Sequence, residues 1–154
     1  MNNYNHYEGV KLYFLNDNEF AVLFTDGITK KIKISLLISK FQNLKPLLDP
    51  IFFKTGRLFN GGIVWNDYVD LDVNQVYDLG ETIKSELNAQ NILVGYRIKQ
   101  IRLYKGLNQQ ELASKCDMDQ ADISKLESGK LNVSINLLQR VVNALDSKIK
   151  IVID

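Results

Sequence analysis

The chain has 154 residues, a hydrophobic fraction of 45% and a formal net charge of +1 at pH 7. This length suits one domain or two small ones, and the hydrophobic fraction suffices for ordinary cores. Nowhere do about 18 apolar residues occur in succession, and no basic region followed by an apolar run begins the chain, so neither membrane insertion nor secretion is predicted and the expected location is the cytoplasm.

Three strands are predicted between Val10 and Ser35. The apolar runs of this segment, VKLYFLNDNEFAVLFTDGITKKIKIS, are separated by turn signals at residues 16–18 and at Asp26-Gly27. An antiparallel meander is the simplest arrangement for such a pattern.

Short helices and two further strands are predicted next. Leu36 to Leu48 has a helical pattern, and Asp49-Pro50 has the form of an N-cap followed by a first helical residue. The segment RLFNGGIVWNDYVDL indicates two short strands around Gly61-Gly62, and Asp72 resembles the cap of a final short helix. Residues 1–80 are therefore expected to form an α+β domain, a small antiparallel sheet with short helices.

The pattern changes after about Gly80. The polar segment ETIKSELNAQN predicts a linker over residues 81–91, and residues 92–146 have helical periodicity. Only KIKIVID returns to a period of two, which predicts a C-terminal strand over residues 147–154. Counting charged side chains gives a net charge of −2 for residues 1–88 and +3 for residues 89–154, so the basic excess lies in the helical half.

The segment NQQELASKCDMDQADISKLESGK, residues 108–130, has the spacing of a helix-turn-helix. A first helix is expected to end near Gly106, and Asn108 with Glu111 has the form of a capping box for a second helix. Ala113 is small because the second and third helices of such a motif cross closely.

The third helix of this motif contains acidic residues although a DNA duplex is strongly negative. Asp119 is explained as the N-cap of the helix, and Asp122 falls on its flank. Stepping about 100° per residue places one set of side chains opposite the buried side. That set comprises Gln120 at its leading edge, Ala121, Ser124, Lys125 and Ser128. We therefore expect an outer face without a central carboxylate.

Three blocks of this segment, LNQQELA, DISKLESGK and LLQRVVNAL, keep their register without a gap. Together they resemble the lambda-repressor-like DNA-binding domain, the Cro and repressor or xenobiotic-response-element type, over residues 92–146. The resemblance implies an all-α helix-turn-helix domain that binds double-stranded DNA.

The resemblance also implies a role for each matching position. The implied base contacts are Gln120, which would face adenine, Ala121 and Lys125. The implied phosphate contacts are Gln109, which would also abut Gln120, Ser124, Lys130 and Asn132. The implied structural ion pair between the first and third helices is Arg102 with Glu127. Asp122 departs from the family, in which this position is usually small and uncharged.

The C-terminal run KIKIVID has two interpretations. A single helix-turn-helix reads only a few base pairs, so sequence specificity generally needs two copies. The run is suited to pair with its twin across a two-fold axis, as tail strands do in antitoxin members of the repressor-like family, and pairing would bury Ile149, Ile151 and Ile153. The equal alternative is a strand that completes the N-terminal sheet.

The N-terminal half contains the motifs LFTDGITKKIKI, LKPLLDPIFFKTGRLF and GGIVWNDYVDLDVNQVY. These resemble a small bacterial domain of unknown function, family 2442, over residues 7–80. The resemblance implies an α+β fold that precedes a repressor-like helix-turn-helix in some chains. Some members are proposed antitoxin components, and the resemblance implies no chemistry.

Catalysis, cofactors and metals are not expected. Cys116 and His6 are the single cysteine and histidine, so no zinc ligand set or internal disulfide is available. No Ser-His-Asp or Cys-His arrangement is expected either, because His6 lies near an N-terminus that is expected to be frayed. Gly61-Gly62 lacks the lysine and helix of a phosphate loop. Three acidic residues near position 70 are interpreted as turn and cap residues rather than cation ligands: Asp67, Asp70 and Asp72.

The sequence thus predicts a bacterial transcriptional regulator of two domains, an autorepressor that binds its operator as a homodimer. The alternative is an antitoxin or adaptor whose N-terminal domain binds a toxin or another partner protein, with DNA binding secondary or lost.

Overall fold

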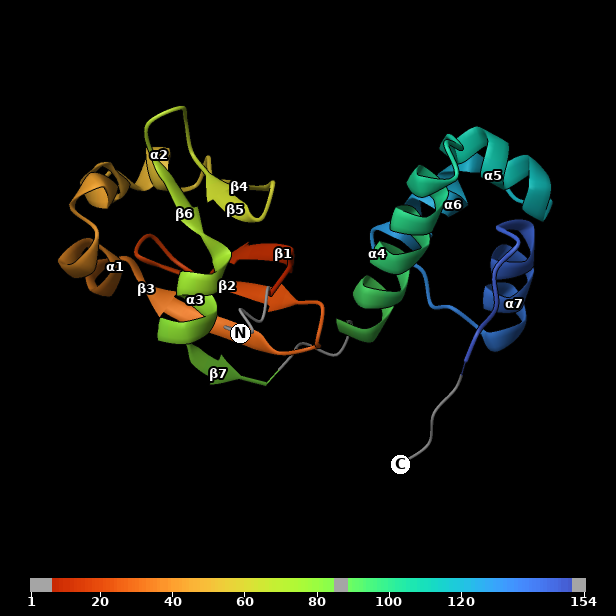
Figure 1. Ribbon diagram of the computed structural model, residues 1–154, viewed down its shortest axis with the longest axis horizontal. Helices are drawn as coiled ribbons and strands as arrows, with labels where there is room; N and C mark the ends of the chain where they lie inside the picture. The colour runs from red at the N-terminus through yellow and green to blue at the C-terminus, as the bar shows by residue number, and fades with distance from the viewer. Residues whose placement is uncertain (1–6, 85–88, 151–154) are drawn as a thin grey trace, which may run out of the picture. The chain divides into compact units, whose positions relative to one another are not determined.

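The computed structural model describes residues 7–84 and 89–150 (Figure 1). The chain divides into two compact units, Met1–Glu86 and Leu87–Asp154. The first is an antiparallel α+β unit and the second is helical, which confirms the predicted fold class in outline. Among the described residues, no helix is long and apolar enough to cross a membrane.

The larger sheet of the first unit has four antiparallel strands in the order β1-β2-β3-β7. Strands β1 (Gly9–Phe14), β2 (Glu19–Phe24) and β3 (Thr29–Lys33) form the predicted meander. Gly27 supplies the left-handed conformation of the second turn, with φ of 88°. All residues of β2 from Phe20 to Phe24 are buried, and Phe20, Val22 and Phe24 pack into the core of this unit.

The fourth strand, β7 (Glu81–Ile83), corrects the predicted linker. It pairs with β3 in the register Thr29↔Ile83 to Lys31↔Glu81, so the first residues of segment 81–91 extend the sheet. The last residues of that segment also belong to regular structure, because helix α4 begins at Ala89. The fourth described strand of this sheet is therefore β7.

The helix predicted over Leu36–Leu48 is divided into two pieces. Helix α1 (Ile34–Lys40) ends before Phe41, and a 3₁₀ helix, η1 (Gln42–Leu48), follows. Pro46 lies inside η1, where its missing N–H and its ring are incompatible with a continuous α-helix. The sequence pattern had detected the apolar positions but not this break.

The remaining elements follow the predicted caps. Asp49 caps α2 (Pro50–Phe53) by accepting a hydrogen bond from the Ile51 amide at 2.8 Å. Asp72 caps α3 (Val73–Leu79) by accepting one from the Asn74 amide at 2.8 Å. Between these helices lies a second sheet in the order β4-β5-β6, which has one strand more than the sequence predicted. Its strands are β4 (Arg57–Phe59), β5 (Gly62–Val64) and β6 (Asp70–Asp72).

The core of the first unit lies between the larger sheet, the short helices and the second sheet. Phe20 and Phe24 from β2 and Phe53 from α2 are fully buried in it. Trp65 is also buried, and its Nε1–H donates to the Phe53 carbonyl at 2.6 Å, so its polar atom is satisfied. Phe53 and Trp65 thus belong to this core, whereas the nearby Tyr68 is exposed.

The described residues of the second unit form four helices. They are α4 (Ala89–Tyr104), α5 (Gln109–Cys116), α6 (Gln120–Glu127) and α7 (Ile135–Ala144). Ile98, Leu112, Ile123, Leu126 and Leu145 are buried where the four helices meet. Each of these helices, or the residue directly after it, thus contributes side chains to the core.

The C-terminal strand predicted over residues 147–154 is not confirmed. Residues 147–150 have no regular secondary structure, and Ile149 is half-buried. Ile151 and Ile153 lie outside the described residues.

Helices α4 and α6 approach each other closely at Gly95. A Cβ built on Gly95 would overlap the Leu126 carbonyl oxygen and lie 2.9 Å from the Glu127 carbonyl oxygen. Both neighbours are backbone atoms of α6, so neither is free to move aside alone. The sequence pattern indicated the small residue at Ala113 but not the one at Gly95.

The substitution Gly95→Ala is expected to destabilise the second unit. Overpacking typically costs about 1–3 kcal/mol, and the better helix propensity of alanine offsets roughly 1 kcal/mol. Urea unfolding followed by far-ultraviolet circular dichroism measures the difference. Gln100→Ala on the exposed side of the same helix is the control, and equal or greater stability of Gly95→Ala would contradict the close approach.

Candidate nucleic-acid interface

Helices α5 and α6 are joined by a tight turn at Asp117, Met118 and Asp119. Asp117 ends α5 in the left-handed region with φ of 52°, a conformation that Asp tolerates better than most residues. Ala113 and Cys116 are buried on the inner side of α5, and burial raises the pKa of the Cys116 thiol. The short turn and these small buried side chains place α6 closely across α5.

Helix α6 presents the outer face that the sequence predicted. Ile123 and Leu126 are fully buried, whereas Ala121, Ser124 and Lys125 are exposed on the other side. Gln120, the first residue of the helix, is also exposed. These four exposed residues together form the outer face of α6.

Asp119 occupies the N-cap position of α6, but its side chain accepts no hydrogen bond from the helix. The sequence pattern predicted that bond, and this detail is wrong. Its carboxylate still lies at the positive end of the helix dipole, where a negative charge is favourable. By contrast, Asn108 and Glu111 form both hydrogen bonds of the predicted capping box, at 2.9 and 2.7 Å.

A chain of hydrogen bonds leads from the core to the outer face of α6. The buried guanidinium of Arg102 contacts both carboxylate oxygens of Glu127, at 2.5 and 2.9 Å. Gln109 Nε2 donates to Glu127 Oε2 at 2.9 Å. Gln120 Nε2 in turn donates to Gln109 Oε1 at 2.6 Å. The implied ion pair and the implied contact between the two glutamines are thus both present in the structure.

Both members of the ion pair have a further hydrogen-bond partner. Arg102 Nη1 also donates to the Leu107 carbonyl at 2.7 Å. The guanidinium therefore connects α4, to which it belongs, with α6 and with the loop that follows α4. The hydrogen bond to Glu127 is the main cause of a raised pKa of Arg102. No buried side-chain nitrogen or oxygen among the described residues lacks a partner.

This chain of bonds determines which way the two side-chain amides point. A carboxylate only accepts hydrogen bonds, so Gln109 must turn its NH₂ group toward Glu127 and its oxygen toward Gln120. Gln120 must then turn its own NH₂ group toward Gln109. Reversing either amide would bring two acceptors together. The hydrogen-bond network therefore assigns both orientations.

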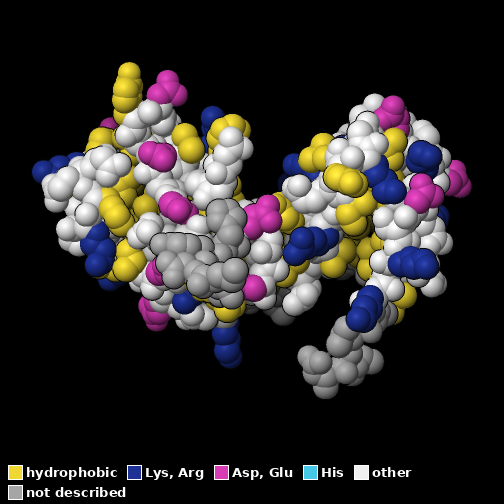
Figure 2. Space-filling model, in the orientation of Figure 1, with side chains coloured by type: hydrophobic (Ala, Val, Ile, Leu, Met, Phe, Trp, Pro, Cys, Tyr) yellow, Lys and Arg dark blue, Asp and Glu magenta, His cyan; other side chains and the backbone are white. Residues whose placement is uncertain are grey.

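The residues implied as phosphate contacts are only partly brought together. Ser124 belongs to the outer face of α6, and Gln109 is half-buried beside it. Lys130 and Asn132 are exposed in the loop after α6, and the Asn132 side chain accepts a hydrogen bond from Asn91 Nδ2 at 3.2 Å. That bond ties the loop to the start of α4. Figure 2 shows Lys and Arg side chains intermixed with a few acidic ones on the visible face of this unit.

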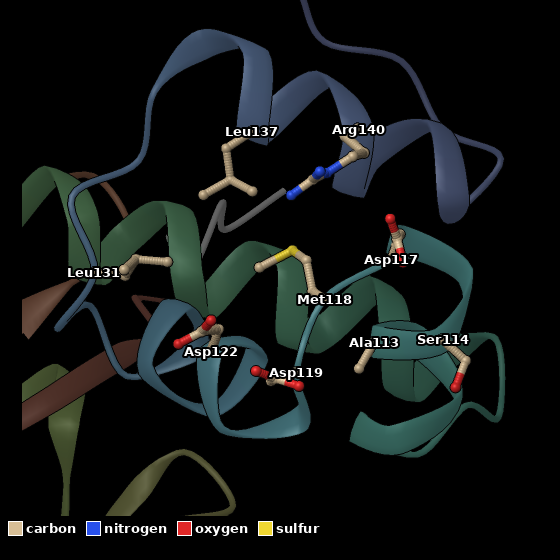
Figure 3. Close-up of a pocket in the computed structure, with 9 residues that line it drawn as sticks. All are labelled: Ala113, Ser114, Asp117, Met118, Asp119, Asp122, Leu131, Leu137 and Arg140. Carbon is tan, nitrogen blue, oxygen red and sulfur yellow. The ribbon is translucent and has the colours of Figure 1, made fainter.

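A groove of about 490 Å³ lies between the α5–α6 turn and α7 (Figure 3). Its apolar part includes Met118, Leu131 and Leu137. Arg140 extends over it from α7, and the carboxylates of Asp117, Asp119 and Asp122 stand on the side of the turn and α6. Across the described residues, no three His, Cys, Asp or Glu side chains are grouped to hold a metal ion.

An ion pair on α6 was not predicted from the sequence. Lys125 Nζ lies 3.1 Å from Asp122 Oδ1, and both side chains are well exposed. The spacing of three residues along a helix was the signal that predicts such a pair. Asp122, on the flank of α6, therefore contacts Lys125 of the outer face.

Comparison with known proteins relates the C-terminal half of the chain to a helix-turn-helix family and to a control protein. A family described as a helix-turn-helix domain matches residues 75–154. The control protein C.BamHI of Bacillus amyloliquefaciens is 35% identical over 68 residues, which cover 44% of this chain and 84% of that protein. The resemblance of residues 7–80 to the domain of unknown function is not confirmed by these matches and stays a prediction.

Solved structures of similar proteins include the restriction-modification controller protein C.AhdI of Aeromonas hydrophila. It is 32% identical, with 39% of this chain and 91% of that chain covered and a TM-score of 0.38. The controller protein C.Esp1396I, solved as a tetramer with its natural 35 base-pair operator, is 34% identical, with 42% and 82% covered and a TM-score of 0.38.

The substitution Arg102→Met is expected to destabilise the second unit by about 3–5 kcal/mol, because it leaves the Glu127 carboxylate buried without its cation. The double substitution Arg102→Met with Glu127→Leu should recover most of this loss, since it removes the buried charge as well. Chemical unfolding of all three chains measures both effects.

The control is Lys54→Met, which removes an exposed ion pair with Asp17 of 2.6 Å. Exposed pairs are worth about 0–1 kcal/mol, so this variant should unfold almost as the unmodified chain does. A similar, small loss for Arg102→Met would show that the buried pair does not hold α4 and α6 together.

Proposed function

We propose that this chain, which belongs to the helix-turn-helix domain family and is homologous to control protein C.BamHI, is a sequence-specific DNA-binding transcription regulator. The observation that carries the proposal is the exposed outer face of α6, held by the buried Arg102–Glu127 pair and extended by Gln109. A surface helix needed only for packing would not require two interlocked glutamine amides at its exposed start.

The major groove of B-DNA is about 12 Å wide and accepts an α-helix. In the proposed complex α6 enters this groove with its N-terminal residues toward the base edges, as recognition helices do. Its short length and its exposed first turn suit this placement. The buried side of α6 remains packed on α4 and α5.

Gln120 reads adenine in the proposed complex. One hydrogen of its NH₂ group is used by Gln109, which leaves the second hydrogen and the oxygen Oε1 for a base. Adenine presents an acceptor, N7, beside a donor, the N6 amino group, and this pair matches the two free positions. Guanine presents two acceptors and would face Oε1 with one of them. The orientation set by Gln109 thus favours adenine.

The other proposed contacts follow from position and side-chain chemistry. Ala121 packs against a thymine methyl group, and Lys125 contacts guanine O6 and N7. Gln109, Ser124, Lys130 and Asn132 contact the phosphate backbone, which fixes the register of the protein on the duplex. The net charge of +3 for residues 89–154 is modest for a DNA-binding unit.

We further propose that the chain acts as a homodimer and represses its own promoter. Two copies of α6 a helical turn apart would read two half-sites, which gives the specificity that one short helix lacks. Residues 147–154, with Ile149, Ile151 and Ile153, are the proposed dimer contact. The first unit would carry contacts to a partner protein or to the twin subunit.

The comparisons favour a regulator over the alternative of an antitoxin or adaptor. The matched relative is named a control protein, and the matched family is described as a helix-turn-helix domain. A toxin partner has no support among these matches.

The substitutions Gln120→Ala and Lys125→Ala are each expected to weaken binding to the selected operator by about 1–3 kcal/mol, because each removes a base contact. Binding is measured by electrophoretic mobility shift on a duplex selected from a random library. Lys105→Ala, which removes an exposed lysine at the end of α4, is the matched control. Unchanged affinity of both variants, with affinity for every duplex lost at raised salt, would contradict sequence-specific binding.

Removal of residues 147–154 is expected to convert a dimer into a monomer and to lower operator affinity, while the four helices stay folded. Sedimentation velocity measures the association, and circular dichroism serves as the control for folding. A truncated chain that still sediments as a dimer would place the dimer contact elsewhere.

A further inference from the structure

The ion pair of Asp122 and Lys125 lies where the proposed function needs a cation. Lys125 belongs to the outer face of α6, yet its ammonium lies 3.1 Å from the Asp122 carboxylate. The Lys125 side chain is 57% exposed and that of Asp122 is 41% exposed. A lysine that serves only to attract phosphates would be weakened by this neighbour.

Packing does not explain the acidic residue. Exposed pairs of this kind contribute little to folding because water solvates both charges well. Position 122 also lies in the first turn of α6, where the helix dipole favours a carboxylate, but Asp119 already places one there. Asp122 is therefore a second negative charge on the helix that would approach a polyanion.

Asp122 lines the groove beside α7 and also contacts Lys125, so it lies between the groove and the outer face of α6. Asp119 lies at the start of the same helix, and Arg140 extends from α7 over the other side of the groove (Figure 3). The Oδ1 atom of Asp122 contacts Lys125, which belongs to the outer face of α6. Asp122 thus lies at the edge of the proposed reading surface and not beneath it.

We propose that Asp122 is a specificity-determining residue that accepts a hydrogen bond from the N4 amino group of a cytosine, while Lys125 contacts the guanine of the same base pair. This inference rests on the proposed function. In the major groove a C·G pair presents the cytosine donor beside the guanine acceptors O6 and N7. The adjacent carboxylate and ammonium match this order of donor and acceptors.

Other base pairs fit the two charges less well. A guanine O6 or a thymine O4 opposite Asp122 would place two acceptors against each other, which is unfavourable when water is excluded. An adenine there satisfies the carboxylate through N6, but its thymine offers Lys125 one acceptor and a methyl group instead of two acceptors. Asp122 therefore acts mainly by rejecting wrong base pairs.

The test is a selection from a randomised duplex library with the full chain and three variants. Asp122→Asn exchanges the carboxylate for an amide that pairs best with adenine N6 and N7. Asp122→Ala removes both possibilities. Asp119→Asn is the matched control, because it removes the same charge from the same end of α6 at a residue outside the ion pair with Lys125, and asparagine is an equally good N-cap.

The expected result is a change of base at one position of each half-site. The unmodified chain and Asp119→Asn should select cytosine there, Asp122→Asn should select adenine by about tenfold over cytosine, and Asp122→Ala should select neither. Affinity for unrelated duplexes should rise similarly in Asp122→Asn and Asp119→Asn, since both lose one negative charge. Circular dichroism confirms that the variants are folded.

Two results overturn the inference and are distinguishable. If the unmodified chain selects a defined sequence and Asp122→Asn selects the same one, Asp122 does not determine specificity, and the proposed function stands. If the unmodified chain selects no sequence at all, both the inference and the sequence-specific function are wrong.

Discussion

The buried contact between Arg102 and Glu127 is the constraint on which the arrangement of the second unit depends. Burying two charges is costly unless their remaining hydrogen-bonding positions are satisfied. Here the Leu107 carbonyl and the Gln109 amide complete them. Glu127 is the last residue of α6, so the contact that anchors this helix also orients Gln109, and through it Gln120, at the opposite end. Stability and presentation of the outer face thus share one set of bonds.

The features that sequence predicted well are local. Apolar spacing indicated which side of α6 is buried, and the caps at Asn108, Asp49 and Asp72 follow from short-range hydrogen bonds. The features that it missed depend on tertiary contacts. Strand β7 exists because β3 offers a free edge, and the close approach at Gly95 depends on where α6 ends.

The same distinction applies to the candidate site. Sequence resemblance placed Gln109 near Gln120, but the direction of both amides follows from Glu127, which lies 18 residues from Gln109 along the chain. The spacing of Asp122 and Lys125, three residues apart on one helix, indicates an ion pair. Helical periodicity alone assigns the two residues to different sides of α6 and does not reveal the pair. A capping bond was predicted for Asp119 from its position, although its side chain makes none. Side-chain pairing therefore remained the least predictable level.

The charges of α6 decide what kind of DNA binding the protein is suited to. Phosphate attraction alone is independent of sequence and requires a strong positive charge. This unit has a small basic excess and carries Asp119 and Asp122 on the helix that would enter the groove. Such a surface is expected to bind unrelated duplexes weakly, so the operator affinity proposed above would depend on matched base contacts and on two copies acting together. In the proposed function, the acidic residues of α6 reduce sequence-independent phosphate attraction and would thereby make DNA binding more selective.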